Sequence, residues 1–324
     1  MRKILFVAAV FALGLAVKMS AQQRDFSQVE IKVEKVAGNV YMLTGSGGNI
    51  GVSVGEDGML IVDDQFAPLA PRIQAALKGI SDKPPRWVLN THWHFDHVGG
   101  NQPFAQSGAQ IIAHDNVRKR MLSSPQDILR DFPARVEEAK KAGRADQAKS
   151  LEEQIEWAKK VKVEEIPAPI VTYDSELRIH VNGETIQVWH TPPAHTDGDS
   201  TVYFEKANVL HMGDLFFNKV IPFIDVKGGG SPGGYLKALD AVIARVPADV
   251  TIIPGHGEVT DVAGLKVFRQ YVADVIDAAK KARASGQSKE DFVKSTELPA
   301  YKDYRGYADR FRDNLASAYD EVNR

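Results

Sequence analysis

The sequence has no cysteine among its 324 residues. This absence excludes disulfide bonds, thiol nucleophiles, iron–sulfur clusters and any metal site that needs a thiolate ligand. An excess of charge of one sign is lacking as well, since 40 Lys and Arg stand against 42 Asp and Glu, and no basic block marks a surface for nucleic acid. We therefore expect no nucleic-acid partner, and a bound metal ion must be held by His and carboxylate side chains.

The apolar run near the N-terminus is too short for an ordinary membrane-spanning helix. It fills positions 4–17, which is fewer than the roughly 20 residues that such a helix needs. Two basic residues precede the run, and the small residues Ser20 and Ala21 follow it at a position suited to cleavage. We interpret residues 1–21 as a secretory signal peptide, with an uncleaved anchor as the alternative. We expect a periplasmic or secreted protein with no membrane contact after cleavage.

Apolar residues make up 44% of the chain and charged residues 25%, which is typical of a globular protein. The length suits one large domain or two ordinary ones. Short apolar segments separated by Gly-containing turns predict antiparallel strands at 29–36, 40–44, 50–54 and 59–62. Strand and helix patterns alternate further along the chain. We therefore predict two sheets packed face to face with helices outside.

Two segments are predicted to be helical additions to this core. Residues 124–165 are rich in Ala, Glu, Lys and Gln, with apolar residues at helical spacing, and indicate a helical insertion that turns near Gly143. Its charges suggest a solvated face, and a cover over one edge of a site is the alternative. Asp115 is predicted to cap a shorter helix beginning near Asn116. The tail at 263–324 is predicted to be almost entirely helical.

The strongest chemical signal is a cluster of His and Asp directly after a predicted strand that ends near Leu89. Side chains two positions apart in an extended segment point the same way, so His92 and His94 can bind one ion together. Asp96 and His97 follow where the chain turns, and we expect them to face a second point nearby. Burying so many imidazoles without a ligand would be unfavourable, so the cluster predicts a metal site.

Three further candidate ligands lie far along the chain, where predicted strands give way to loops. They are His195 in a loop between two strands, Asp214 in a Gly-Asp pair and His256 in a Pro-Gly-His-Gly turn. Each alone would be an ordinary loop, turn or cap residue. Because a layered fold can bring strand ends to the same rim, together they predict one site.

This order of motifs resembles that of the metallo-β-lactamase superfamily. The resemblance runs from about Val29 to Gly257 and includes Leu60-Ile61-Val62-Asp63, which is similar to the superfamily's early strand followed by Asp. It implies an α/β fold, a four-layer αββα sandwich of two mixed sheets with metal ions at one edge. On this interpretation residues 22–324 form the domain, with the helical insertion and the tail as its additions.

The resemblance also implies two ligand sets that share one carboxylate: His92, His94 and His195 in the first, Asp96, His97 and His256 in the second, and Asp214 bridging them. Nitrogen and oxygen donors without thiolate suit Zn²⁺ first, with Fe or Mn as alternatives. Two zinc ions would lower the pKa of a shared water, so that hydroxide attacks a carbonyl at neutral pH. Asp96 and Asp214 would supply the negative charge for this catalysis. Asp63 is expected to orient the ligand loop, or simply to end its strand.

The sequence departs from the best-known zinc β-lactamases, which have Cys where Asp214 stands and Lys three residues later. Position 217 is Phe, and a bridging Asp is similar to glyoxalase II-like members, which open esters or thioesters. The resemblance therefore implies a small-molecule ester, thioester, lactone or amide as substrate. Phe217 could form an apolar substrate wall or pack in the core. Lys219 could reach a substrate acid or be a surface residue.

Other functions stay open from the sequence. A metallo-β-lactamase acting on β-lactam antibiotics and a mononuclear iron oxygenase relative are the enzymatic alternatives. A non-catalytic protein that keeps zinc for structure is the third, although structural zinc sites are closed and hold one ion. The sequence does not indicate an oligomeric state.

Overall fold

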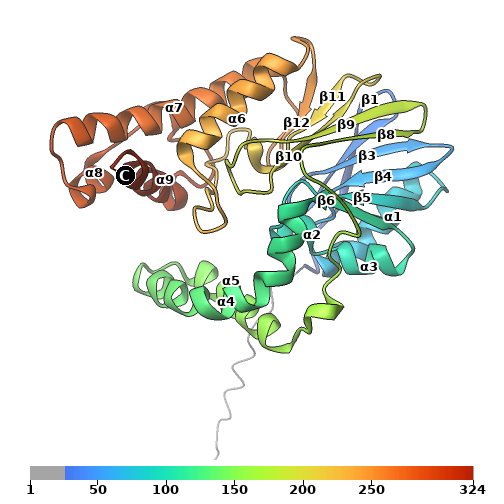
Figure 1. Cartoon of the computed structure of the whole chain (residues 1–324), viewed down its shortest axis with the longest axis horizontal. Helices are drawn as coiled ribbons and strands as arrows, with labels where there is room; N and C mark the ends of the chain where they lie inside the picture. The colour runs from blue at the N-terminus through green and yellow to red at the C-terminus, as the bar shows by residue number, and fades with distance from the viewer. Residues whose placement is uncertain (1–25, 324) are drawn as a thin grey trace, which may run out of the picture.

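Two β-sheets stacked face to face form the centre of the molecule in the computed structural model, which describes residues 26–323 (Figure 1). The predicted signal peptide, residues 1–21, lies outside the described residues. Among residues 26–323 no helix combines the length and the apolar character needed to cross a bilayer.

The first sheet is antiparallel in its first half and parallel in its second. Its strands lie in sequence order: β1 Lys32–Ala37, β2 Val40–Thr44, β3 Ile50–Gly55, β4 Gly58–Val62, β5 Pro85–Leu89, β6 Gln110–His114 and β7 Val171–Tyr173. Strand β4 is buried on both faces, so Leu60 and Val62 point between the sheets while Met59 and Ile61 point to the outer helices. The predicted antiparallel start is confirmed.

The second sheet has the order β12-β11-β10-β9-β8 and is antiparallel except for the parallel pair β11 and β12. Its strands are β8 Glu176–Val181, β9 Glu184–His190, β10 Ser200–Phe204, β11 Val209–His211 and β12 Thr251–Ile253. Asn182 and Gly183 join β8 to β9 with φ of 57° and 65°. Two positive φ values are what a tight hairpin turn requires, and Asn-Gly meets them at least cost.

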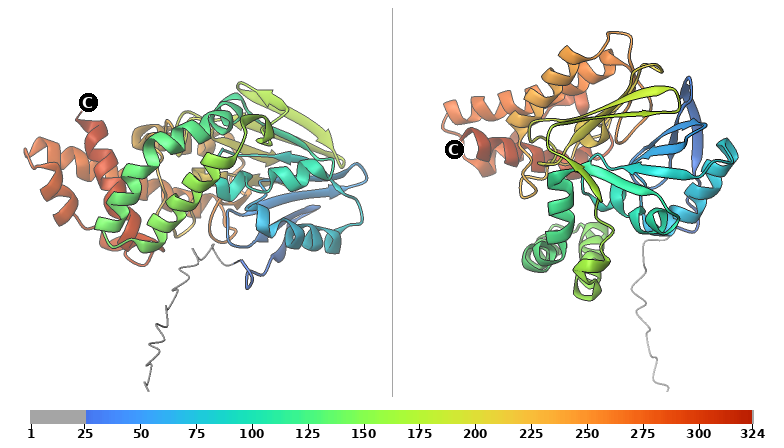
Figure 2. Two further views of the ribbon diagram at one scale, coloured as in Figure 1. Left: turned by 90° about the horizontal axis from the view of Figure 1, so that it is seen from below. Right: turned by 45° about the vertical axis from the view of Figure 1, so that its right-hand side comes forward.

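Helices cover the outer face of each sheet (Figure 2). The α-helices are α1 Ala70–Ile80, α2 Phe95–Val98, α3 Asn101–Gln106, α4 Asp115–Lys141, α5 Ala145–Lys160, α6 Pro232–Arg245, α7 Val262–Ala284, α8 Lys289–Ser295 and α9 Tyr307–Val322, and short 3-10 turns are η1 Ala67–Leu69, η2 Val163–Glu165, η3 Gly213–Leu215 and η4 Pro299–Tyr301. Residues of α1 and α3 pack on the first sheet, and those of α6, α7 and α9 pack on the second. The predicted αββα sandwich of two mixed sheets is confirmed.

Helix α4 begins earlier than the sequence pattern predicted. His114, rather than Asp115, is the cap, because its Nδ1 accepts the N–H of Asn116 at 3.2 Å. The helix continues through position 124, the predicted start of the insertion, and contains Pro125 and Pro133. The change in composition marks where α4 leaves the sandwich rather than where it begins.

The outer part of α4 and the helix α5 form a hairpin that projects from the sandwich (Figure 2). Val136 and Ala139 pack against Ala148 and Leu151 in a small apolar core that the hairpin does not share with either sheet. Gly143, with φ of 69°, lies in the turn between the helices. An ion pair of 3.4 Å between Arg144 and Asp313 links this turn to α9. We call α4 and α5 together the helical hairpin.

The edge that matters for function is formed by the ends of four strands. The parallel strands β4 and β5 end at Val62 and Leu89, and the parallel strands β11 and β12 end at His211 and Ile253. Loops that follow parallel strands leave a sheet at the same edge. The segments that carry Asp63, the histidine cluster, Asp214 and His256 therefore meet there.

Phe268 of α7 tests whether the C-terminal helices belong to the same cooperative unit as this edge. Its side chain is 2% exposed and its ring lies 5.3 Å from that of Phe216, which follows Asp214 closely in sequence. We expect Phe268→Ala to lower the free energy of unfolding by about 3–5 kcal/mol, because it leaves a large cavity. Urea unfolding measures this change. Val267→Ala is the matched control, since Val267 is 53% exposed, and an equally small effect of both variants would contradict the prediction.

Candidate metal centre

The histidine cluster lies where β5 ends and the short helix α2 begins. His92 Nε2 and His94 Nδ1 are 3.1 Å apart, so the two rings point to one place, as their spacing predicted. His94 is the residue before α2, and the helical turn carries Asp96 and His97 away from that place. The six-residue segment His92–His97 therefore supplies side chains to two neighbouring points.

Donor atoms from three segments that are distant in sequence meet beside His92 and His94. His195, in the loop between β9 and β10, brings its Nε2 to 2.8 Å from His94 Nδ1 and to 3.4 Å from Asp214 Oδ2. The donors of His92, His94, His195 and Asp214 all lie within 4.8 Å of one another. These four residues form what we call the first donor set.

The second point is formed by Asp96, His97 and His256, the second donor set. Asp96 Oδ2 lies 3.4 Å from His256 Nε2 and 3.7 Å from His97 Nε2. His97 is fully buried, and a Cβ atom at Gly48 would collide with its ring. Glycine at position 48 therefore permits the close approach of two segments.

Asp214 lies between the two sets and turns one oxygen to each. Its Oδ2 faces His195 at 3.4 Å and His92 at 3.9 Å, while its Oδ1 faces His97 at 3.1 Å and His256 at 3.4 Å. The structure thus brings all seven residues expected to be ligands into one cluster, and Asp214 has the position expected of a bridge.

Outward hydrogen bonds fix which nitrogen of each ring faces the cluster. His195 Nδ1 donates to the carbonyl oxygen of Phe223 at 2.6 Å, and His94 Nε2 donates to Asp225 Oδ2 at 3.1 Å. His97 Nδ1 donates to Asp63 Oδ2 at 2.7 Å. A neutral imidazole has one N–H, so in the neutral form that binds metal each inner nitrogen presents a lone pair to the cluster.

Asp63 orients one histidine of each donor set. Besides His97 it accepts the Thr91 N–H and the Thr91 hydroxyl, both at 2.8 Å. That hydroxyl lies 3.0 Å from His92 Nδ1, which donates to it because the hydroxyl proton is already given to Asp63. Asp63 is fully buried and has a φ of 65°, an uncommon conformation for a residue other than glycine. Its position suits the orienting role that we expected.

The donor atoms that face the centre of the cluster need a cation between them. His97 Nε2 and Asp214 Oδ1 are buried 3.1 Å apart, and neither has a hydrogen-bond partner among the described residues. A buried imidazole nitrogen and a carboxylate oxygen at this distance need a positive charge between them, which either a proton or a metal ion can supply. Imidazole nitrogen and carboxylate oxygen are ligands that Zn²⁺, Fe and Mn accept. The donor atoms therefore fit divalent metal ions.

The two sets differ in how they hold protons in the absence of metal. Burial lowers the pKa of His195 to about 4 and also lowers that of His92, so both rings are neutral at pH 7. Burial acts on His256 in the same direction, but the carboxylates of Asp214 and Asp96 outweigh it and raise its pKa to about 9. The pKa of His97 is raised for the same reason.

Two supporting carboxylates, Asp225 and Asp199, were not predicted from the sequence. Asp225 holds His94 and accepts the N–H of Gly228 at 3.0 Å. Asp199 accepts the backbone N–H groups of His195 and Thr196 at 2.8 and 2.9 Å, which shapes the loop that presents His195. The spacing of Asp199 from His195 is a signal for a local turn, whereas nothing in the sequence indicates the partner of Asp225.

The expectation that Phe217 and Lys219 contact substrate is not supported by their positions, and neither lines the cavity at the cluster. Phe217 is buried and stacks behind His256, with ring centroids 5.2 Å apart. Lys219 is exposed, and its carbonyl oxygen accepts the N–H of Arg305. Their neighbour Phe223 lines the cavity instead.

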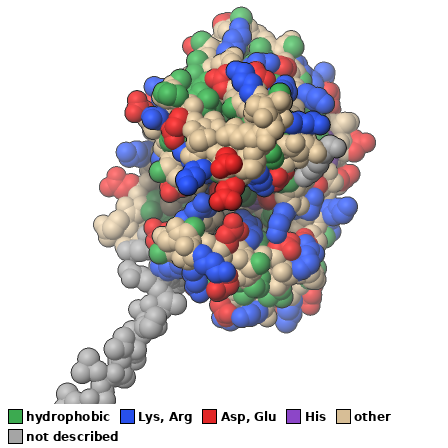
Figure 3. Space-filling model, turned by 90° about the vertical axis from the view of Figure 1, so that its left-hand side faces the viewer, with side chains coloured by type: hydrophobic (Ala, Val, Ile, Leu, Met, Phe, Trp, Pro, Cys, Tyr) green, Lys and Arg blue, Asp and Glu red, His purple; other side chains and the backbone are tan. Residues whose placement is uncertain are grey.

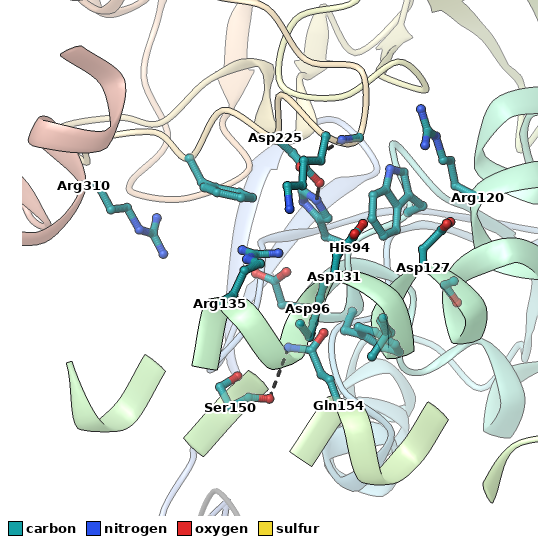
Figure 4. A pocket seen from close by; sticks show the side chains of 18 of the residues that line it. His94, Asp96, Arg120, Asp127, Asp131, Arg135, Ser150, Gln154, Asp225 and Arg310 are labelled. Atoms are coloured by element: carbon teal, nitrogen blue, oxygen red, sulfur yellow. Dashed lines mark hydrogen bonds and ion pairs between the residues drawn. The ribbon is translucent and has the colours of Figure 1, made fainter. Parts of the chain in front are cut away.

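A cavity of about 590 Å³ opens onto the cluster at His94, Asp96 and His256 (Figure 4). Aromatic side chains of Trp93 and Phe95 line it beside the cluster. The helical hairpin forms the opposite wall, so it shapes the cavity rather than only covering the sandwich. Residues near the start of α9 complete the rim.

The match to known proteins agrees with this geometry. A family model described as the metallo-beta-lactamase superfamily matches residues 35–256, about two thirds of the chain. The chain belongs to this superfamily. The superfamily match ends at His256, so α7, α8 and α9 lie beyond it.

Curated relatives in the superfamily are distant and varied. The chain is 27% identical to a hydroxyacylglutathione hydrolase of Anaeromyxobacter dehalogenans, over 63% of this chain and 59% of that protein. It is 22% identical to the 2,4-dinitroanisole O-demethylase subunit alpha of Nocardioides sp., over 57% of this chain and 46% of that protein. It is 19% identical to a metallo-beta-lactamase type 2 of Bacteroides fragilis, over 60% of this chain and 61% of that protein. The chain spans about half the length of the curated relatives it matches.

Solved structures share the fold. The DIM-1 metallo-beta-lactamase superposes with a TM-score of 0.55 at 18% identity, covering 76% of this chain and 99% of that one. A metallo-beta-lactamase from Pontibacter korlensis gives a TM-score of 0.56 at 15% identity, covering 75% and 99%. The superfamily sandwich is therefore present nearly whole in this chain, which carries additional helical segments.

Replacing Asp63 tests its orienting role in this superfamily member. In Asp63→Asn an amide N–H₂ takes the place of one accepting oxygen, so a donor would face His97 or Thr91. We expect the affinity for Zn²⁺ to fall about 10–100-fold, with the fold retained. Competition with a chromogenic chelator measures the affinity, and circular dichroism checks the fold.

Asp64→Asn is the matched control for this experiment. Asp64 is equally buried, but its Oδ1 accepts only the N–H of Gly100 and its Oδ2 has no hydrogen-bond partner within residues 26–323. Burial, with the neighbouring Asp63, raises the pKa of Asp64 well above its usual range, so an uncharged amide suits the site. Equal loss of affinity in both variants would contradict the specific role of Asp63.

Proposed function

We propose that this protein is a metal-dependent hydrolase that holds two divalent cations and cleaves an ester, thioester, lactone or amide of a small molecule. The observation that carries the proposal is the placement of Asp214, whose two oxygens each face a separate set of imidazoles. When bound, two Zn²⁺ ions, or Fe or Mn, would act as Lewis acids and lower the pKa of a water molecule.

The exposed side of the cluster indicates where substrate would bind. The side chains of His94, Asp96 and His256 are 16%, 32% and 18% exposed, whereas His92, His97 and His195 are almost completely buried. The exposed three line the cavity, so a scissile carbonyl entering it would meet them first. Asp96 is the most exposed carboxylate of the cluster, and it lines the cavity.

The completeness of the donor sets favours two cations over one. A mononuclear iron oxygenase relative would need only part of the cluster, and a structural site would be closed to solvent. Hydrolysis is also the reaction named for two of the relatives, the hydroxyacylglutathione hydrolase and the metallo-beta-lactamase. A β-lactam is therefore a substrate to be tested alongside esters. The basic and apolar residues at the N-terminus lead us to propose a periplasmic or secreted location.

His94→Ala tests the proposed activity directly. His94 has donors of the first set on both sides, so its loss should reduce bound cation from two equivalents to one and lower turnover at least about 100-fold. Elemental analysis and a panel of nitrophenyl ester, thioester, lactone and β-lactam substrates measure the two effects. His180→Ala is the control, because His180 is exposed on β8 and bonds only Thr185. Wild-type protein without metal, or with chelator-insensitive turnover, would disprove the proposal.

The second donor set should lose its cation first as pH falls. Protons compete with metal at His256, whose pKa is about 9 in the metal-free protein, so each unit of acidification below that value weakens this set about tenfold. The first set should resist acid better, because burial lowers the pKa of His195 to about 4 and also lowers that of His92. We expect two equivalents near pH 8 and one near pH 5, as measured by elemental analysis after equilibrium dialysis. Simultaneous loss of both cations would contradict the assignment.

A further inference from the structure

The cavity wall opposite the metal centre carries arginines that have no acidic partner. Arg135 of α4, Arg305 before α9 and Arg310 in α9 all line the cavity. Within residues 26–323 none of their side chains makes an ion pair or a hydrogen bond; the guanidinium of Arg135 rests over the ring of Phe132, 4.7 Å from its centre. An unpaired guanidinium in a cavity is a ready binding group for a carboxylate, sulfate or phosphate.

Two other arginines of the wall are already neutralised by acidic partners. Arg120 pairs with Asp197 at 2.6 Å, and Arg130 pairs with Asp127 and Asp131 at 2.8 and 2.9 Å. Lys227 is unpaired among the described residues and exposed at the rim, as Arg305 and Arg310 are, whereas Arg135 is half-buried.

The acids that line the cavity do not offset the three arginines. Asp96 and Asp225 face histidine rings of the metal centre, and Asp127 and Asp131 pair with Arg130. Asp309 remains as the single lining acid with no cation partner in the described part of the chain. The free charge of the wall is therefore positive.

The two walls that supply the arginines face each other. Figure 4 shows Arg135 and Arg310 directed into the same opening from the helical hairpin and from α9, with Asp96 and His94 behind them. Figure 3 shows the side of the molecule where these helices meet, with Lys and Arg side chains around a hollow and Asp and Glu among them. A ligand in the opening would thus meet the metal centre at one end and guanidinium groups at the other.

The start of α9 is tied to the loop that follows Asp214. The N–H of Arg305 donates to the carbonyl oxygen of Lys219 at 3.1 Å, and the N–H of Ile221 donates to that of Arg305 at 2.9 Å. These bonds fix the backbone of Arg305 relative to Phe223, which lines the same cavity. The spacing between this basic wall and the metal centre is therefore set by the fold, which lowers the ordering cost of binding.

We propose that Arg135 and Arg310, assisted by Arg305, form an anion subsite, so that the preferred substrate has an apolar body, a hydrolysable carbonyl and an anionic group at its far end. This inference rests on the proposed function for the reacting end only. Trp93, Phe95 and Phe223 line the cavity and suit the apolar body. Arg305 and Arg310 lie beyond the segment that matches the superfamily, whereas Arg135 lies within it, so the subsite joins the matched part of the chain to the C-terminal helices.

Turnover of matched esters tests the substrate class. The mono-4-nitrophenyl ester of adipate carries a free carboxylate, and 4-nitrophenyl hexanoate has the same chain length without it. We expect kcat/KM to favour the adipate ester at least about tenfold, mainly through KM, and about 0.5 M NaCl to reduce this preference. Arg135→Gln and Arg310→Gln should each remove most of the preference, because they lower kcat/KM for the adipate ester far more than for the hexanoate. Arg130→Gln, on the same helix but already paired, should leave the preference intact.

A binding measurement separates this inference from the proposed function. In the His94→Ala background, calorimetry compares the mono-anilide of adipate with hexananilide, and we expect at least about tenfold tighter binding of the anionic anilide. Adding Arg135→Gln or Arg310→Gln should abolish that difference. Hydrolysis of both esters without an anionic preference would overturn the subsite and leave the hydrolase proposal standing. Anion-selective binding without hydrolysis of either ester would support the subsite and disprove the hydrolase proposal.

The nature of the anion is decided by competition. Inorganic phosphate, sulfate and acetate added to the adipate ester assay should raise its KM in the wild type, and the most effective ion identifies the preferred headgroup. The same ions should not affect the Arg135→Gln, Arg310→Gln double variant. Equal inhibition of the wild type and the double variant would show that the ions act at the metal centre, and would overturn the subsite.

Discussion

The structure is organised around the cost of burying one carboxylate among four imidazoles. Each carboxylate oxygen of Asp214 lies within 4 Å of two ring nitrogens, from His92 and His195 on one side and from His97 and His256 on the other. The carboxylate is buried, so water does not screen its charge. Outward hydrogen bonds remove the freedom of three of the rings to turn away. The site is therefore held in a conformation that divalent cations complete.

The sandwich supplies the rigidity that such a site needs. Asp63 follows β4 and the histidine cluster follows β5, while Asp214 and His256 follow β11 and β12, one parallel pair from each sheet. Strands packed on both faces leave little freedom to their ends. Glycines 48, 213 and 255 then allow backbone to approach the ligands, because a Cβ atom at any of them would collide with a neighbour.

Much of this was predictable from sequence, because motif spacing is a local property. The His-x-His-x-Asp-His segment and the Asn182-Gly183 turn carry their geometry in adjacent residues. Partners far apart in sequence could not be predicted in this way; Asp225, for example, lies 131 positions from His94. Phe217 was equally compatible with cavity and core, and only the packing against His256 decided between them. The insertion was predicted to begin at position 124, inside α4, because the first turns of this helix pack on the sandwich and lack the composition of the outer hairpin.

The helical hairpin has an apolar core of its own, and the ion pair between Arg144 and Asp313 links its turn to α9. Substitutions on its inner face alter the cavity without touching any donor to the cations. Natural variation can therefore reshape what the protein accepts while the reaction chemistry stays constant. The hairpin is therefore a part of the cavity wall whose shape can change independently of the donor cluster.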